Sequence, residues 1–141
     1  MSTLDSILLP PDALVRDALT QIDVGASQLA IIVDDQRRVI GVVTDGDVRR
    51  GLLAGVTLDD TVERIMNRNP KLVSVDASDE EIQALMRREV IHQVPIVDGE
   101  GRIVALRTID TFVAADRLEN TVVLMAGGLG MRLRPLTETV P

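Results

Sequence analysis

The sequence predicts an α+β fold made of two β-α-β-β-α repeats that pack as a pseudo-two-fold pair. Residues 39–47 return without a gap as residues 103–111, at an offset of 64 residues that places Ala105 on Gly41. The same offset aligns residues 31–35 with 95–99, and the helical spacing of 18–22 with 82–86. Each copy also combines short apolar runs with a segment of helical period. A repetition of this length indicates paired structural units.

The first copy predicts a helix, two strands and a second helix, in that order. A helix is expected over residues 13–22, with Asp12 as its cap. Residues 29–33 and 39–44 are continuous apolar runs, too short for helices, and predict buried strands joined by a turn. Asp47 is expected to cap the next helix, over residues 48–53, which Gly55 closes.

The second copy predicts the same elements. Residues 72–75 form a short extended piece, and Ser78 with Glu81 three residues on has the form of a capping box that starts a helix ending near Arg88. Strands follow over 94–97 and 103–106, then a helix from Asp110. We assign residues 1–60 to the first repeat and 61–118 to the second, with a helical turn at 61–66 and a break at Asn69-Pro70.

Composition excludes several classes of function. The net charge of −7 opposes binding to nucleic acid or anionic membranes, and the single aromatic residue, Phe112, gives no base-stacking platform. No cysteine is present, which excludes disulfides and thiolate metal sites. No basic segment opens the chain and no apolar run nears the roughly 18 residues of a membrane span, so we expect a cytoplasmic protein. With one histidine and no clustered ligands, neither a metal site nor catalysis by these residues alone is expected.

Two segments carry a resemblance to a known family. Gly41-Val-Val-Thr-Asp-Gly-Asp47 is similar to the Gly-h-h-Thr/Ser-x-x-Asp signature of CBS domains, where h is an apolar residue. His92-Gln-Val-Pro-Ile-Val-Asp98 resembles the h-Pro-h-h-Asp strand of the same family. The resemblance covers about residues 1–118 and implies a tandem CBS pair, or Bateman module.

The junction between strand and helix in the first copy is the candidate ligand site. Backbone N–H groups and the positive end of a helix suit a phosphate there. The resemblance implies that Thr44 and Asp47 hold the ribose and phosphate of an adenosine nucleotide, and that His92 reaches the phosphate across the repeat interface, beside Asp47 and not Asp110. The alternatives are that Asp47 is only a helix cap, Thr44 a strand end and His92 a surface or packing residue. The candidate ligand residues are Gly41, Val42, Thr44, Asp47, His92, Pro95 and Thr108.

The second copy departs from this signature. Thr108 is retained, but Thr111 stands at the acidic position, and its hydroxyl cannot replace a carboxylate that grips two ribose oxygens. We therefore expect at most one strong nucleotide site. Asp110 near its entrance favours AMP or ADP over ATP, an effect that Arg49, Arg50 and Arg107 would offset unless they are solvated surface residues.

A third motif has no counterpart in either repeat. Residues 122–126 form a strand-like run before the glycine-rich Gly127-Gly-Leu-Gly130, and with Met131-Arg-Leu-Arg-Pro-Leu-Thr137 they resemble the opening of sugar-1-phosphate nucleotidyltransferases. In that family the glycines cradle the nucleoside triphosphate and the arginine matching Arg132 stabilises charge on its phosphates. Met131 replaces the usual Thr or Ser. The implied residues of the nucleotide loop are Ala126, Gly127, Gly128, Gly130 and Arg132.

Residues 119–141 are thus expected to be the truncated start of a nucleotidyltransferase domain. The expected lysine, the metal-binding aspartates and the sugar pocket would follow Pro141, so we expect no catalysis here and Mg²⁺ only in a full-length parent. The alternative is a naturally short chain with an accidental glycine-rich tail.

Two functions remain open from the sequence. In the first, the pair senses AMP or ADP and regulates its own nucleotidyltransferase domain. In the second, it binds no ligand and holds the enzyme as a homo-oligomer, most simply a dimer, through the apolar pairs Leu52-Leu53 and Leu85-Met86. Ligand binding distinguishes the two.

Overall fold

The computed structural model describes residues 4–25 and 27–113. The five residues of the nucleotide loop expected between 126 and 132 lie outside the described residues, as does the remainder of that motif.

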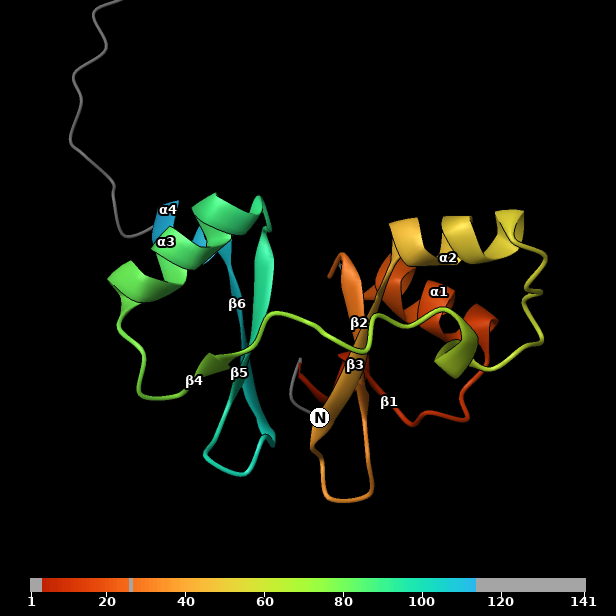
Figure 1. Ribbon diagram of the computed structural model, residues 1–141, viewed down its shortest axis with the longest axis horizontal. Coiled ribbons are helices and arrows are strands. Elements are labelled where there is room, and N and C mark those ends of the chain that lie inside the picture. The colour runs from red at the N-terminus through yellow and green to blue at the C-terminus, as the bar shows by residue number, and fades with distance from the viewer. Residues whose placement is uncertain (1–3, 26, 114–141) are drawn as a thin grey trace, which may run out of the picture.

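Two three-stranded sheets of identical topology confirm the α+β fold and its repeat (Figure 1). In the first sheet, β1 (Leu8–Leu9) runs parallel to β2 (Leu29–Val33), which pairs antiparallel with β3 (Val39–Thr44). The second sheet repeats this with β4 (Val73–Ser74), β5 (Gln93–Val97) and β6 (Ile103–Thr108). Leu9 pairs with Ile32 and Val73 with Ile96, so even the register follows the sequence offset.

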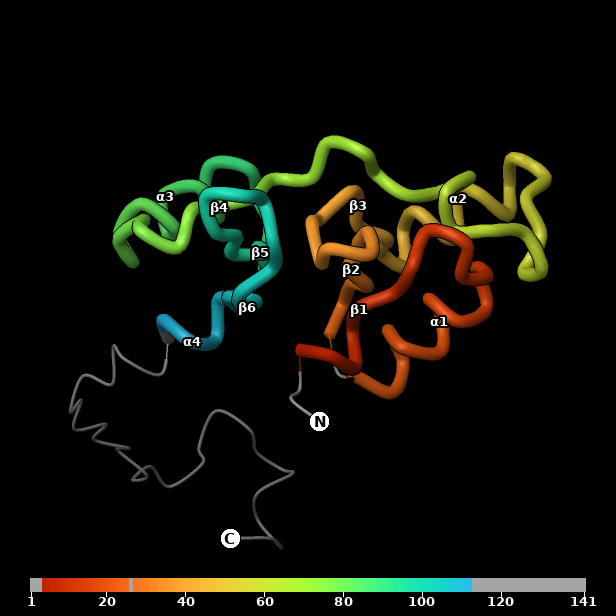
Figure 2. The backbone as a smooth tube through the Cα atoms, turned by 90° about the horizontal axis from the view of Figure 1, so that it is seen from below, coloured from red at the N-terminus to blue at the C-terminus, as the bar shows by residue number. Residues whose placement is uncertain are grey.

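Helices cover the outer side of each sheet, and the two sheets meet at the centre of the molecule (Figure 2). The first repeat contains the 3₁₀ turn η1 (Asp5–Ile7) and helices α1 (Val15–Val24) and α2 (Asp45–Leu53). A 3₁₀ turn, η2 (Val62–Arg64), follows in the linking segment. The second repeat contains α3 (Asp79–Glu89) and α4 (Ile109–Val113). None of the described helices is long and apolar enough to cross a bilayer.

Two helices begin elsewhere than predicted. The cap of α2 is Thr44, and Asp47 is its third residue, because the pair forms a capping box like that of Ser78 and Glu81 at the start of α3. The N-cap of α1 is Leu14, whose N–H donates to Asp17 Oδ2 at 3.0 Å, and Asp12 lies outside the helix. In both helices the aspartate that accepts the hydrogen bond, Asp17 in α1 and Asp47 in α2, lies inside the first turn. The sequence had predicted an aspartate before the first turn.

Three hydrophobic clusters form the core, and one of them joins the repeats. Ile103 of the second repeat packs with Ile7, Leu29 and Ile31 of the first. The predicted docking face Leu85-Met86 is wrong, because Met86 is 2% exposed and packs inside the second repeat. Its i−4 neighbour Ile82 packs in the same cluster, so this face of α3 covers its own sheet.

Backbone hydrogen bonds also connect the repeats at the hairpin turns. Val39 N–H donates to the Gly101 carbonyl and Ile103 N–H to the Arg37 carbonyl, both at 3.0 Å. The linking segment adds to the first repeat, because Val62 is fully buried in its core and Asn67 exchanges two backbone hydrogen bonds with Val42. The packing of the first repeat therefore continues past residue 60, where the sequence places the boundary.

Candidate functional site

A cavity of about 620 Å³ lies between the repeats, at the end opposite the paired hairpins. Three segments line it: Ser27–Leu29 before and at the start of β2, Thr44–Gly46 at the start of α2, and Val90–Gln93 after α3, with Ile22 beside them. The first turn of α2 and the last turn of α3 lie on the same side of the two sheets (Figure 1). The cavity thus joins a helix N-terminus of one repeat to a helix C-terminus of the other.

Thr44 stands where β3 turns into α2. Its extended backbone, with φ −110° and ψ 166°, completes the strand while its side chain caps the helix. The Thr44 hydroxyl oxygen accepts from Asp47 N–H at 3.3 Å and the hydroxyl donates to Asp47 Oδ2 at 2.7 Å. The first N–H groups of a helix have no intrahelical partner, so this end of α2 offers donors and a positive dipole end to the cavity.

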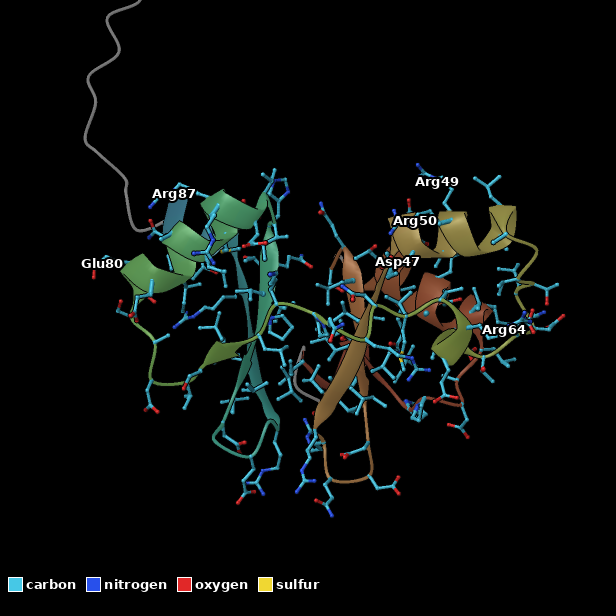
Figure 3. All side chains as sticks on the ribbon, in the orientation of Figure 1. Asp47, Arg49, Arg50, Arg64, Glu80 and Arg87 are labelled. Atoms are coloured by element: carbon cyan, nitrogen blue, oxygen red, sulfur yellow. The ribbon has the colours of Figure 1, made fainter. Side chains whose placement is uncertain are left out.

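Asp47 does not line the cavity, and its carboxylate is occupied. Oδ2 accepts from the N–H and the hydroxyl of Thr44, while Oδ1 accepts from Arg50. Its side chain is 14% exposed. The structure therefore shows the capping role directly. Figure 3 shows Asp47 and Arg50 at the start of α2, with Arg49 extending away from the body of the protein.

His92 is an exposed residue that lines the cavity from the second repeat. Its carbonyl accepts the N–H of Ile109 at 2.9 Å, which fixes the backbone between α3 and β5. His92 and Thr44 line one cavity and come from different repeats. The placement of His92 beside Asp47 and not Asp110 stays a prediction.

Four predicted residues are not among those that line this cavity. Gly41 lies in β3 against the linking segment: a Cβ there would meet Met66 Sδ at 2.8 Å and the Asn67 carbonyl at 3.0 Å. Its neighbour Val42 is 8% exposed. Pro95 is buried in β5, and Thr108 ends β6 with its hydroxyl 3.2 Å from that of Thr111. A ligand role for these four residues stays a prediction.

Gln28 and Gln93 also line the cavity and were not predicted. Gln28 N–H donates to Gln93 Oε1 at 3.1 Å, a hydrogen bond between the repeats in the cavity wall. The repeat offset could have predicted this contact, because it aligns residues 27–29 with residues 91–93. Equivalent segments of two repeats contact each other where both lie close to the two-fold axis that relates the repeats. Val90 and Ile22 were missed for a different reason, since only tertiary packing brings helix ends to the cavity.

The lining of the cavity offers groups that suit ligand binding. Within residues 4–25 and 27–113, no set of three His, Asp or Glu side chains could hold a metal ion. The two aspartates in the first turn of α2 form ion pairs with arginines on the same helix, Asp45 with Arg49 and Asp47 with Arg50. Their negative charge is thereby offset, so the helix end can accept an anion.

Comparison with known proteins settles the family. The model described as "CBS domain" matches residues 1–54 and 62–106. The chain belongs to the CBS domain family. Its two repeats are a tandem CBS pair, as the signatures at residues 41–47 and 92–98 predicted.

Relatives of this CBS pair are longer proteins. An uncharacterized protein of Helicobacter pylori strain J99 is 30% identical over 107 residues, 75% of this chain and 32% of the relative. The arabinose 5-phosphate isomerase KdsD of Yersinia pestis is 34% identical over 96 residues, 64% of this chain and 28% of the relative. The chain thus spans about a third of the length of the curated relatives it matches.

A solved structure shares the fold. The CBS domain protein of Pyrobaculum aerophilum, in complex with AMP, superposes with a TM-score of 0.66 at 24% identity, covering 78% of this chain and 88% of that one. Two repeats of this kind, packed as a pair, are therefore an established architecture.

Proposed function

We propose that this CBS pair is a regulatory module that binds an adenine nucleotide, AMP or ADP, in the cavity between its repeats. The observation that carries the proposal is the meeting of the α2 N-terminus, Thr44 and His92 on one cavity of about 620 Å³. This volume falls within the roughly 300–1,000 Å³ range of small-molecule sites. A helix N-terminus and a histidine are both suited to a phosphate.

Both repeats would contribute residues to the nucleotide site. The phosphate would take the α2 N-terminus and His92. The ribose would take Asp47, which is not a lining residue but contacts the lining residue Thr44 through its carboxylate. The AMP complex of the Pyrobaculum aerophilum protein supports an adenine nucleotide as the ligand. Because the lining comes from both repeats, a bound nucleotide would change how they sit together, which is the basis of a regulatory signal.

Isothermal titration with AMP, ADP, ATP and S-adenosylmethionine tests the proposal, since the chain has no tryptophan to report binding. AMP and ADP are expected to saturate one site. Asp47→Ala should weaken binding at least tenfold, the loss expected when a hydrogen bond to a charged group is removed. Absence of heat with every ligand would overturn the proposal.

Glu81→Ala is the matched control. Glu81 is the third residue of α3 and accepts from Ser78 N–H at 2.8 Å, as Asp47 does from Thr44. Both variants remove a capping box, but Glu81 lies away from the cavity. Equal loss of binding in both would mean that Asp47 acts only through stability.

We further propose that the pair regulates a cytoplasmic sugar-1-phosphate nucleotidyltransferase with which it shares a chain. Support comes from residues 122–137, which carry the glycine-rich loop and Arg132 of that family's opening. In the full-length protein, Mg²⁺-dependent release of diphosphate from a nucleoside triphosphate and a sugar 1-phosphate is expected, with a rate that changes when AMP is added. A rate that does not respond to AMP would contradict the regulatory link.

A structural role is the second candidate, favoured by two exposed leucines of α2. Leu52 is 44% and Leu53 84% exposed, and contact with a second copy would bury them. Sedimentation of the wild type and Leu53→Lys tests this role. A dimer that dissociates in the variant supports a homodimer through α2, and a wild type that is already monomeric rejects it.

A further inference from the structure

Arg50 differs from the other arginine of α2 in where its guanidinium lies. Its Nη1 atom is 3.3 Å and its Nη2 atom 3.8 Å from the position that a Cβ at Gly46 would take. Gly46 lines the cavity, so the guanidinium lies beside a lining residue, although Arg50 itself is not one. The lack of a side chain at residue 46 leaves this space open.

The Arg50 guanidinium occupies the one oxygen of Asp47 that the capping box does not use. Oδ2 accepts two hydrogen bonds from Thr44, and Oδ1 accepts from Arg50 Nη2. A ribose hydroxyl that binds Oδ1 must share this oxygen with Arg50 or displace it. The Arg50 side chain is 73% exposed, so nothing packed around it prevents that movement.

The second repeat lacks this pair. At the offset of 64 residues, Thr111 stands in place of Asp47 and Ala114 in place of Arg50, so carboxylate and guanidinium are absent together. The remaining Thr108 and Thr111 make a neutral contact of 3.2 Å between their hydroxyls. The ion pair is therefore a feature of α2, whose first turn lines the cavity, and not of α4, the equivalent helix of the second repeat.

We propose that Arg50 makes the nucleotide site selective for phosphorylated ligands by exchanging Asp47 for the ligand phosphate. Without an anion in the cavity, Arg50 holds Asp47 Oδ1. A phosphate bound at the start of α2 takes over the guanidinium, which frees Oδ1 to accept a ribose hydroxyl. An unphosphorylated nucleoside competes with Arg50 for the same oxygen and supplies no anion in return, so it binds more weakly.

The chemistry of arginine suits this exchange. Its planar guanidinium pairs with a carboxylate or a phosphate through parallel hydrogen bonds, so one ion pair replaces another. S-Adenosylmethionine has a sulfonium and an ammonium group but no phosphate. It therefore cannot form the ion pair with Arg50 that replaces the ion pair with Asp47. The inference rests on the proposed function and names the ligand class of that site: nucleotides rather than nucleosides.

The test compares the affinities of AMP and adenosine, measured by isothermal titration, for the wild type, Arg50→Gln and Arg49→Gln. In the wild type AMP should bind more tightly than adenosine. Arg50→Gln should lower AMP affinity about tenfold or more and leave adenosine affinity equal or higher, so that the ratio of the two falls. Arg50→Lys, which keeps the charge without the planar fork, should give a ratio between those of the wild type and Arg50→Gln.

Arg49→Gln is the matched control, because Arg49 is also 73% exposed and also pairs with an aspartate in the first turn of α2, yet it points away from the body of the protein (Figure 3). It should keep the wild-type ratio. An unchanged ratio in Arg50→Gln, or an equal fall in both variants, overturns the selectivity while leaving nucleotide binding intact. A wild type that binds neither ligand overturns the proposed function and this inference together.

Discussion

Val90 occupies a backbone conformation that β-branched residues rarely adopt. It ends α3 with φ 54° and ψ 45°, its N–H donates to the Met86 carbonyl, and 82% of the residue is exposed. The left-handed region costs an L-residue roughly 1–2 kcal/mol. Because Val90 also lines the cavity, the strain lies at the candidate site, where such strain is most often found.

Val90→Gly should therefore stabilise the protein. Glycine adopts positive φ without the clash of a Cβ, and little apolar burial is lost, so we expect the free energy of unfolding to rise by about 1 kcal/mol in urea denaturation. AMP affinity should fall, because the rim of the cavity loses an apolar side chain. Val24→Gly is the control: Val24 is 78% exposed but lies in the last turn of α1, where glycine destabilises a helix. Equal shifts of both variants would show that strain at residue 90 has no measurable cost.

At the scale of elements, the linking segment adds an edge to the first sheet. Asn67 forms an isolated bridge with Val42 of β3, and the segment passes so close that residue 41 has no room for a Cβ. The second repeat has Ala105 at the aligned position. Gly41 is thus explained by the crossing of a chain segment over β3.

Gly41→Ala should destabilise the first repeat. The new methyl group would meet the Met66 sulfur, which can move, and the Asn67 carbonyl, which two hydrogen bonds to Val42 hold in place. We expect a loss of about 1–3 kcal/mol in the free energy of unfolding. Gly99→Ala, where nothing lies within 4 Å of the added Cβ, should change stability by less than about 0.5 kcal/mol. Comparable losses in both variants would contradict the close approach.

The turn between β5 and β6 predicts a response to acid. Asp98 has a pKa lowered from 3.8, first by the backbone N–H of Arg102 and then by its guanidinium. A folded-state pKa below the unfolded value contributes stability that is present above pH 3.8 and is lost as the pH falls through the folded pKa. Between about pH 5 and pH 3, the urea midpoint of the wild type should fall further than that of Asp98→Asn, which keeps an oxygen for the turn but cannot titrate. Parallel curves for the two proteins would show that Asp98 has no such linkage.

The sequence predicted the strands and helices of the repeats other than the short β1, but not where capping residues act. Thr44 satisfies the patterns of a strand end and of an N-cap at once, because an N-cap has extended backbone angles, and the strand assignment concealed the box with Asp47. The same box was evident at Ser78, which no apolar run precedes. The local sequence pattern therefore predicts where strands and helices lie. The role of a residue that both ends a strand and caps a helix is seen only in the structure.

At the scale of the whole molecule, the repeat explains why a cavity lies between the two copies but not which residues line it. An offset aligns residues of the two copies, so it predicts that equivalent strand starts face each other, as Ser27–Leu29 and Ile91–Gln93 do. It does not predict which helix end covers them, since α2 and α4 differ in sequence where they begin. Thr44 and His92, which were predicted as ligand residues, line this cavity, whereas Gln28, Gln93 and Val90 line it without having been predicted.

The repeats should unfold as one unit because their shared cluster and hairpin bonds join them. Ile103 is 6% exposed and packs on Ile7, Leu29 and Ile31 across the interface, while Ile82 is 3% exposed and packs within the second repeat. Ile103→Ala and Ile82→Ala should each cost about 2–5 kcal/mol in urea denaturation. Only Ile103→Ala weakens the joint itself, so it should also lower the slope of unfolding against urea or divide the transition in two. Ile82→Ala should shift the midpoint at the wild-type slope. If Ile103→Ala kept the wild-type slope as well, the hairpin bonds and the Gln28–Gln93 contact would be enough to couple the repeats.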